Sequence, residues 1–271
     1  MKPLPAILSL FLILPLSSLA EEHPLQGKLA EQNSQPAPLQ FHGYLGFDLK
    51  LPSRANARII APKTTREGHP WIWRARFWGH QPALDLALLE QGYHLCYCDV
   101  SHLFGNPKAV ARWDEFYQLT QKLKLHPQPI LEGMSRGGLI VFNWAKANPD
   151  KVTAIYADNP VCDIRSWPYE KSAKNWKNCL KAYGMTEEES VNFKGNPIDG
   201  LEVLAKAKVP LFFVLGEADA VVPIKDNALV LIERYQALGG TVTTWKKPSL
   251  GHHPHGLDPV TPLVNALLEL P

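Results

Sequence analysis

The sequence predicts an α/β protein with a mostly parallel, doubly wound central sheet, helices on both faces and a small cap insertion. Short apolar runs typical of buried strands alternate with longer segments whose apolar residues recur at helical spacing. Such alternation is typical of parallel strands joined by crossover helices. The length of 271 residues and the hydrophobic content of 45% suit one domain with a full core.

Residues 1–20 are expected to be a secretory signal peptide. Lys2 gives the segment a positive start, and residues 6–16 form a mostly apolar run. Ser18 and Ala20 are small residues of the kind that precede a cleavage site, so cleavage is expected after Ala20. The predicted location is therefore secreted or periplasmic. An uncleaved membrane anchor is the alternative, and it is disfavoured because the apolar run is short for a bilayer span.

Residues 21–40 are expected to form a flexible leader. They are polar, rich in Gln, Pro and Glu, and show neither helical nor strand periodicity. Segments of this composition bury too little apolar surface to fold by themselves. A single domain is predicted to follow over residues 41–271.

Strands and helices of the domain are predicted from the period of their apolar residues. Strands are expected at residues 41–51, 57–61, 71–78, 93–100, 129–132, 151–157, 209–215 and 241–245. The first two are expected to form a hairpin. Helices are expected at residues 83–91, 107–123, 139–146, 228–238 and 259–270, and a glycine directly follows the first and fourth of them, as is typical of helix ends.

Residues 165–200 interrupt this alternation and are expected to form a cap over the site. Their Trp and Tyr side chains could stack on sugar rings or could form the core of the cap. Cys162 and Cys179 lie in or beside this segment, and in an oxidising compartment they could pair or remain free. Cys96 and Cys98 point to the same face of a predicted strand and are expected to be small buried apolar residues.

The charge pattern and the cysteine spacing exclude several classes of protein. The formal net charge is +2, and Lys and Arg form no stripe, so neither a nucleic acid nor a membrane partner is expected. The cysteines form no C-x-x-C motif, so neither a redox nor a zinc motif is indicated.

Residues 133–138 read Gly-Met-Ser-Arg-Gly-Gly and lie between a predicted strand and a predicted helix. A G-x-S-x-G motif in this context is the nucleophile elbow of serine hydrolases. The sharp turn exposes the serine oxygen, and the glycines let the strand and the helix pass close together. The helix N-terminus favours negative charge that develops beside it. Ser135 is therefore the predicted nucleophile.

A nucleophilic serine needs a base and an orienting carboxylate, and in an open α/β sheet these come from loops at the carboxyl ends of strands. Asp219 lies in such a loop, directly after the predicted strand 209–215. We take Asp219 as the candidate carboxylate and Glu217 as the alternate. A purely structural role for Asp219, as a helix cap or turn carboxylate, is the other alternative.

The loop of residues 248–256 follows the last predicted strand and contains three histidines. Imidazole suits general base work at neutral pH, and His252, directly after Gly251, is the candidate base. His253 and His255 are expected to shape or line the pocket. A solvated loop is one alternative. A zinc site that uses His252 and His255 is another, but no Cys, Asp or Glu cluster accompanies them, so no metal is predicted.

Ser135, Asp219 and His252 follow one another in the order of nucleophile, acid and base in the α/β-hydrolase superfamily. Residues 41–271 resemble that superfamily, including a Gly-x-x-Asp-x-x-Val-Pro pattern that begins at Gly216. The resemblance implies an α/β-hydrolase fold with about eight mostly parallel strands. It also implies a Ser-His-Asp hydrolase that works through an acyl-enzyme without a cofactor.

The oxyanion hole departs from the pattern of lipases and many esterases, which carry His-Gly-Gly-Gly after the third strand. Residues 74–80 here read Arg-Ala-Arg-Phe-Trp-Gly-His. The backbone N–H of Arg136 is one expected donor, and the second is expected near Arg76 and Phe77. The Arg136 guanidinium could stabilise the oxyanion, bind a substrate carboxylate or tie down loops by salt bridges. An Arg after the nucleophile also resembles glucuronoyl esterases of carbohydrate degradation.

Together these features predict a secreted serine esterase that cleaves a carboxylic ester on a carbohydrate, such as an acetyl or uronate ester. The expected partner is a small-molecule or glycan ester substrate. A serine peptidase similar to prolyl oligopeptidase is the alternative among hydrolases, although such enzymes usually carry a large N-terminal propeller, for which this chain has no room. A non-catalytic binding module on a hydrolase fold is the alternative outside the hydrolases.

Overall fold

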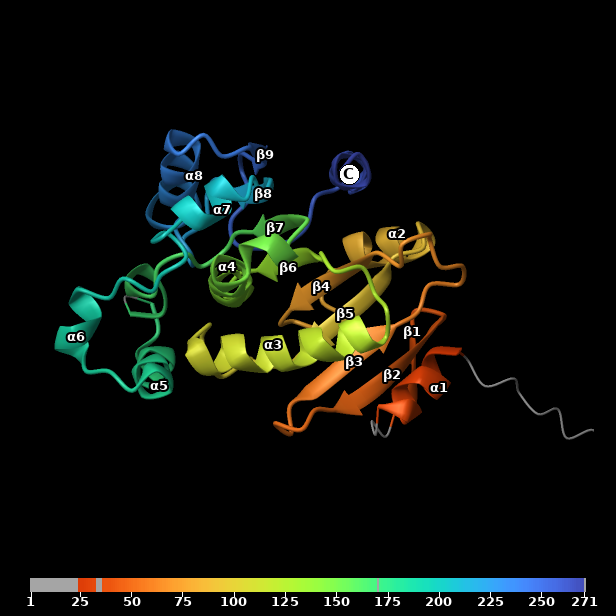
Figure 1. Ribbon diagram of the computed structural model, residues 1–271. Helices are drawn as coiled ribbons and strands as arrows, with labels where there is room; N and C mark the ends of the chain where they lie inside the picture. Colours follow the sequence, from red (N-terminus) through yellow and green to blue (C-terminus); the bar gives the residue numbers. More distant parts are fainter. Residues whose placement is uncertain (1–23, 33–35, 170, 271) are drawn as a thin grey trace, which may run out of the picture.

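The computed structural model describes residues 24–32, 36–169 and 171–270, and a nine-stranded sheet forms the centre of this described part (Figure 1). The strand order across the sheet is β1-β2-β3-β5-β4-β6-β7-β8-β9. The strands are β1 (Ala37–Phe41), β2 (Tyr44–Lys50), β3 (Asn56–Ile60), β4 (Trp71–Ala75), β5 (His94–Cys98), β6 (Ile130–Met134), β7 (Ala154–Asp158), β8 (Leu211–Gly216) and β9 (Val242–Lys247). The predicted signal peptide, residues 1–20, lies outside the described residues.

Two kinds of pairing divide the sheet. β1, β2, β3 and β5 pair antiparallel, and the expected hairpin is β2 with β3. From β5 through β4 and β6 to β9 every pair is parallel. In this register Ala75 of β4 pairs with Gly133 of β6, and Asp158 of β7 pairs with Met134 of β6. The carboxyl ends of these strands therefore meet at one edge, where open α/β sheets place their ligands.

Helices cover both faces of the sheet, which confirms the doubly wound α/β fold. α1, α3, α4, α7 and α8 contribute to the core on one face, and α2 and α9 contribute to the core on the other. The helices are α1 (Pro24–Glu31), α2 (Ala83–Glu90), α3 (Pro107–Lys122), α4 (Gly137–Ala147), α5 (Ala173–Tyr183), α6 (Glu187–Val191), α7 (Glu202–Lys206), α8 (Ala228–Ala237) and α9 (Thr261–Leu268). None of these described helices has the length and hydrophobicity needed to cross a membrane.

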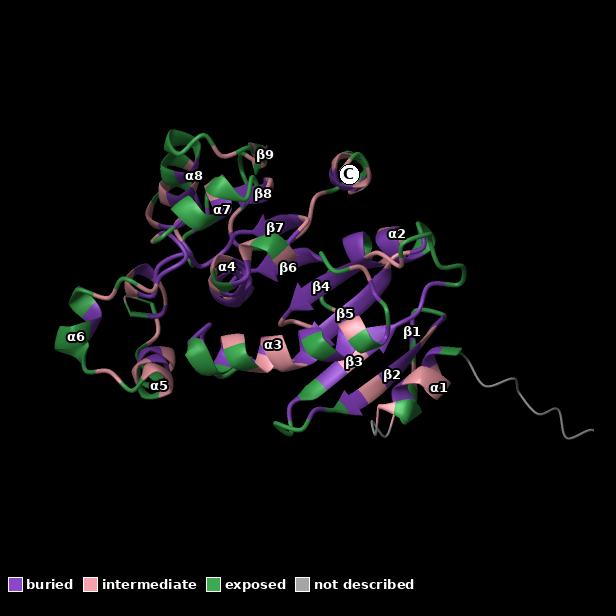
Figure 2. Ribbon diagram, in the orientation of Figure 1, coloured by how far each residue is buried: buried purple, intermediate pink, exposed green. Residues whose placement is uncertain are grey.

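The central strands are buried on both faces, so they read in the sequence as mostly apolar runs (Figure 2). Aromatic side chains fill much of the core beneath α3 and α4. Trp73 of β4 stacks on Trp113 of α3 with their ring centroids 4.0 Å apart, and Trp144 of α4 meets Trp73 edge to face at 5.1 Å. This packing holds the helix that follows Ser135 firmly against the sheet.

The prediction of a flexible leader over residues 21–40 was wrong for most of its described residues. Residues 24–31 form α1, in which Leu25 and Leu29 are buried in the core. Residues 37–41 form the edge strand β1. The two leucines lie four positions apart and so share one face of the helix. Their polar neighbours dilute this period in the sequence, which is why composition alone was misleading.

β4 ends at Ala75, earlier than the expected strand of residues 71–78. Arg76 and Phe77 have φ angles of 62° and 46°. These values lie in the left-handed region, which breaks the strand and turns the chain across its carboxyl end. The apolar and aromatic composition of residues 76–78 gave no sign of this turn.

Residues 165–169, α5 and α6 occupy the segment expected to be a cap. Trp176 and Cys179 of α5 are buried against Leu139 of α4. Trp176 Nε1 donates a hydrogen bond to Glu187 at 3.0 Å, and the Tyr183 hydroxyl donates to the Phe104 carbonyl oxygen at 2.9 Å. These two aromatic side chains therefore form part of the core of the segment, which is the second of the two roles considered for them.

All four cysteines lie in the described part of the chain, and each is a buried free thiol. Cys162 and Cys179 are both buried and are not bridged, so of the two alternatives considered for them the structure shows free thiols. Cys96 and Cys98 both belong to the core on the α3 and α4 face, as expected for alternate residues of one strand.

Candidate active site

Ser135 occupies the turn between β6 and α4. Its φ angle is 51°, in the left-handed region that non-glycine residues rarely adopt. A Cβ atom on Gly137 would lie 2.8 Å from the Ala75 carbonyl oxygen, and one on Gly133 would lie 2.6 Å from a methyl group of α4. Only glycine fits at these two points of close approach. The Ser135 N–H donates to the Asp158 carbonyl oxygen at 2.8 Å, which helps to fix the turn.

The structure brings Ser135, His252 and Asp219 together in one chain of hydrogen bonds. Ser135 Oγ lies 2.9 Å from His252 Nε2, and His252 Nδ1 lies 2.7 Å from Asp219 Oδ2. Each of the three residues is at most 8% exposed, so water competes little with these bonds. A serine, a base and an orienting carboxylate in this geometry are what nucleophilic catalysis by a hydroxyl requires.

The loop after β8 presents Asp219 and not Glu217 to the histidine. Asp219 Oδ1 accepts hydrogen bonds from the N–H groups of Val221 and Val222 at 2.9 and 2.8 Å, which leaves Oδ2 for His252. Glu217 pairs with Lys246 at 3.1 Å, where the Lys246 side chain is 56% exposed. Asp219 therefore has both the turn role and the orienting position that were weighed against each other.

Asn159 ties together the loops that carry the acid and the base. Its Oδ1 accepts from the Gly216 N–H at 2.7 Å, and its Nδ2 donates to the Gly251 carbonyl oxygen at 3.2 Å. Gly216 ends β8, and Gly251 directly precedes His252. Asn159 was not singled out from the sequence, although it lies two residues after the expected strand 151–157, in the region where site residues of α/β sheets occur.

A second histidine–carboxylate pair lies beside the first. His255 Nδ1 is 2.5 Å from Asp158 Oδ1, and both residues are buried. Asp158 Oδ2 also accepts from the Gly256 N–H at 2.7 Å. The rings of His255 and His252 meet edge to face with centroids 4.7 Å apart. Asp158 was missed in the sequence, although the same position directly after a predicted strand that selected the triad carboxylate would have selected it.

The loop after β4 carries the two expected oxyanion residues, Arg76 and Phe77, and lies beside the elbow. Arg74 holds this loop by donating to the carbonyl oxygens of Phe77, at 3.2 Å, and His80. Among the described residues, neither the Phe77 N–H nor the Arg136 N–H has an acceptor, so both are free to donate. The Arg76 side chain donates to a carbonyl oxygen of the neighbouring loop, and burial lowers its pKa.

The Arg136 guanidinium lies against two aromatic rings. Its Cζ is 5.9 Å from the centroid of Phe104 and 5.6 Å from that of Trp167. In the described part of the chain no carboxylate forms an ion pair with it, so the salt-bridge role considered for Arg136 is not seen there. Its position is set by the two rings. No pattern in the sequence marked Phe104 as part of this site.

Arg74 also pairs with two buried carboxyl groups under the oxyanion loop. Its Nη1 lies 2.6 Å from Asp85 Oδ2 and 2.9 Å from Glu132 Oε1, and all three residues are at most 2% exposed. Burial raises the pKa of the Glu132 carboxyl well above its usual value, and it also raises that of Asp85. One proton on this pair of carboxyl groups would leave the cluster of Arg74, Asp85 and Glu132 with no net charge.

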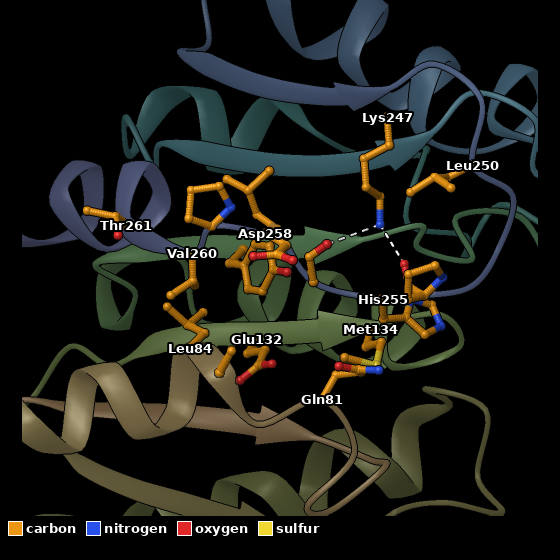
Figure 3. A pocket seen from close by; sticks show the side chains of 16 residues that line it. Gln81, Leu84, Glu132, Met134, Lys247, Leu250, His255, Asp258, Val260 and Thr261 are labelled. Atoms are coloured by element: carbon orange, nitrogen blue, oxygen red, sulfur yellow. Dashed lines mark hydrogen bonds between the residues drawn. The ribbon is translucent and has the colours of Figure 1, made fainter.

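A cavity of about 700 Å³ lies next to His255 on the face of the sheet that α2 and α9 cover (Figure 3). Glu132 and His255 line it. Lys247 crosses its rim and donates to two carbonyl oxygens of the histidine loop, at 2.7 and 3.1 Å. Neither Ser135 nor His252 belongs to its lining, so the cavity is separate from the point where the serine would attack.

The model of the prolyl oligopeptidase family matches residues 120–258, which include Ser135, Asp219 and His252. This chain belongs to the prolyl oligopeptidase family. No curated protein sequence matches it.

Solved structures of peptidases share its fold. The puromycin-hydrolyzing peptidase of Mycobacterium tuberculosis has a TM-score of 0.62 at 15% identity, over 86% of this chain and 38% of that one. Dipeptidyl peptidase 4 of Porphyromonas gingivalis has a TM-score of 0.62 at 16% identity, over 91% and 38%. The acylaminoacyl peptidase of Pyrococcus horikoshii has a TM-score of 0.55 at 18% identity, over 84% and 39%. The chain thus spans less than two fifths of the length of these proteins, and the likeness confirms the α/β-hydrolase fold.

The prediction of a carbohydrate esterase was wrong. The family match and the peptidase structures support the alternative reading, a peptidase similar to prolyl oligopeptidase. Two observations had favoured a glycan: an Arg after the nucleophile and aromatic residues in the cap. In the structure Arg136 lies against Phe104 and Trp167, and Trp176 and Tyr183 pack within the cap. Neither feature was specific to sugars.

Proposed function

We propose that this protein is a serine peptidase that cleaves amide bonds of peptides, with Ser135 as nucleophile, His252 as general base and Asp219 as orienting carboxylate. The observation that carries the proposal is the continuous chain of hydrogen bonds from Ser135 through His252 to Asp219, at 2.9 and 2.7 Å. Membership of the prolyl oligopeptidase family supports an amide substrate over a glycan ester.

In the proposed reaction Ser135 Oγ attacks the scissile carbonyl carbon while its proton passes to His252 Nε2. The imidazolium that forms is stabilised by Asp219, which accepts from Nδ1. The oxyanion accepts from the backbone N–H of Arg136 and from a second donor in the loop of Arg76 and Phe77. His252 then gives the proton to the leaving amine, and water hydrolyses the acyl-enzyme by the same steps.

The test is labelling of Ser135 with a fluorophosphonate, together with turnover of a panel of aminoacyl and dipeptidyl p-nitroanilides and p-nitrophenyl esters. We expect one adduct on the wild-type chain, none on Ser135→Ala, and a loss of turnover of at least about 10³-fold in the variant. Hydrolysis of esters with no amide hydrolysis would contradict the peptidase. A folded wild-type protein that takes no adduct would favour the binding module.

We also propose that Arg136 selects substrates with a carboxylate close to the scissile bond. The guanidinium is held by two rings beside the nucleophile and has no acidic partner in the described residues, so its N–H donors remain available. A charge-assisted, bidentate bond to a carboxylate would use them. Arg136→Ala should raise the KM for a Glu-containing substrate by about tenfold and leave that of its Gln analogue unchanged. Equal effects on both substrates would contradict this specificity.

Export of the chain remains a proposal that rests on residues 1–20. Lys2, the apolar run of residues 6–16 and the small residues Ser18 and Ala20 support it. The mature protein recovered from medium or periplasm should begin at Glu21. Recovery of a chain that begins at Met1, in the cell fraction alone, would contradict the proposal.

A further inference from the structure

The loop that supplies the proposed base contains three histidines, whereas the proposed reaction uses only one. His252, His253 and His255 each offer a ring nitrogen, and these three nitrogens lie within 4.8 Å of one another. Their rings meet edge to face, with centroids 4.7 to 5.1 Å apart. His80, from the oxyanion loop, approaches the same group, with its ring 6.0 Å from that of His255. Neither His253 nor His80 has a role in the proposed reaction.

The hydrogen bonds of the two buried histidines match those of metal ligands. A histidine that binds a metal through one ring nitrogen usually donates from the other to a carboxylate, which fixes the ring and its tautomer. His255 Nδ1 is held by Asp158 at 2.5 Å, and His252 Nδ1 is held by Asp219 at 2.7 Å. The Nε2 atom of His255 is therefore left with its lone pair.

The ring nitrogens of the three histidines lie farther apart than the ligands of one zinc ion, and a movement of His253 can bring them closer. Zinc–nitrogen bonds of about 2.0–2.1 Å place tetrahedral ligands about 3.4 Å apart, so the nitrogens, now within 4.8 Å of one another, must approach by up to about 1.4 Å. His253 is exposed, whereas His252 and His255 are buried, so the movement can come from its side.

We propose that His252, His253 and His255 form an inhibitory site for Zn²⁺ or a similar transition metal ion. Both ring nitrogens of His252 are used by the triad, Nδ1 by Asp219 and Nε2 by Ser135. An ion that takes either nitrogen removes a hydrogen bond of the triad, so the metal-bound protein has no base for Ser135. The inhibition rests on the proposed function, whereas binding of the ion does not.

Binding is tested on the full chain with Ser135→Ala, by calorimetric titration with zinc chloride alone. We expect one ion per chain. His253→Gln in the same background should weaken binding by about tenfold or more, and Asp158→Asn, which removes the partner of His255, by about 10–100-fold. His126→Gln is the matched control, because His126 precedes β6 at the opposite edge of the sheet. Affinity that is equal in the His253→Gln and His126→Gln chains would overturn the site.

Inhibition is tested on chains with Ser135, by the rate of fluorophosphonate labelling with and without zinc, each variant being compared with its own zinc-free rate. We expect zinc to slow the labelling of the wild type, a chelator to restore it, and His253→Gln to need about tenfold more zinc. Visible absorption of the Co²⁺ form reports tetrahedral nitrogen ligation without any substitution. Saturable zinc binding that leaves the labelling rate unchanged would overturn the inhibitory role. A wild-type chain that takes no label even without zinc would count against the proposed function alone.

Discussion

The two oxygens of Asp219 have different tasks at the residue scale. Oδ1 accepts from two backbone N–H groups of its own turn, and Oδ2 accepts from His252. Asp219 therefore holds its own turn and contacts the proposed base with different oxygens. Glu217, the alternate carboxylate, forms an ion pair with the exposed Lys246 and has no contact with His252.

We predict that Asp219→Asn lowers kcat by about 10³–10⁴-fold, because the amide would present N–H groups to His252 Nδ1 and favour the wrong tautomer. The carbonyl oxygen of Asn can still accept from the turn, so the fold should be retained. Steady-state kinetics and thermal unfolding measure the two effects. Glu217→Gln is the matched control and should change kcat by less than about twofold. A similar loss in both variants would mean that the loop and not the carboxylate was damaged.

The site residues that could be predicted from the sequence are those with a local signature. Ser135 lies in a motif with glycines that the turn requires, and Asp219 and His252 follow predicted strands in the expected order. Asp158 has no motif, and its partner His255 is 97 positions away in the chain. The contact of Arg136 with Phe104 depends on how the loop after β5 folds over the elbow. Such contacts follow from tertiary packing and leave no trace in local periodicity.

At the scale of elements, α1 shows that a helix packed against the core can have only a weak apolar period in the sequence. Leu29 is fully buried in the core on the α3 face although only two residues of α1 are buried. Leu29→Ala should lower the free energy of unfolding by about 2–5 kcal/mol, because it removes a buried side chain and leaves a cavity. Urea unfolding monitored by tryptophan fluorescence measures this change. The exposed Glu31→Ala is the control and should have little effect. Equal stability of Leu29→Ala and wild type would restore the reading of a flexible leader.

Arg74, Asp85 and Glu132 form a buried cluster that links β4, α2 and β6. Burial raises the pKa of Glu132 above its usual value of 4.5. The folded state therefore holds a proton that the unfolded chain releases, and stability falls as the pH rises above about 4.5 towards the raised pKa. Glu132→Gln keeps the shape and needs no proton, so its free energy of unfolding should lose this pH dependence. Urea unfolding between pH 4.5 and 8 is the measurement. Parallel pH profiles for the two proteins would show that Glu132 is ionised in the fold.

The whole molecule follows the predicted architecture most closely where strands are buried on both faces. β4 to β8 are buried along their whole length and read as mostly apolar runs. The edge strand β1 is mostly exposed and has no such run. Substrate class was the least accessible property, because one fold serves many hydrolases and the elbow is common to them. The family match over residues 120–258 supports the peptidase proposed above, whereas the composition of the cap pointed to a glycan.

The four thiols connect the fold to the expected export of the chain. In an oxidising compartment free cysteines persist only when they are protected, and here all four are buried. Burial raises the pKa of Cys179 to about 12 and that of Cys162 well above its usual value, so little reactive thiolate forms. We predict that the purified, unreduced protein takes up four alkyl groups under denaturing conditions, reacts far more slowly when native, and keeps its Tm when a reductant is added. Mass spectrometry after alkylation counts the groups. A chain that takes up only two, with a peptide linking Cys162 to Cys179, would show that the oxidised protein packs its cap differently from the reduced one.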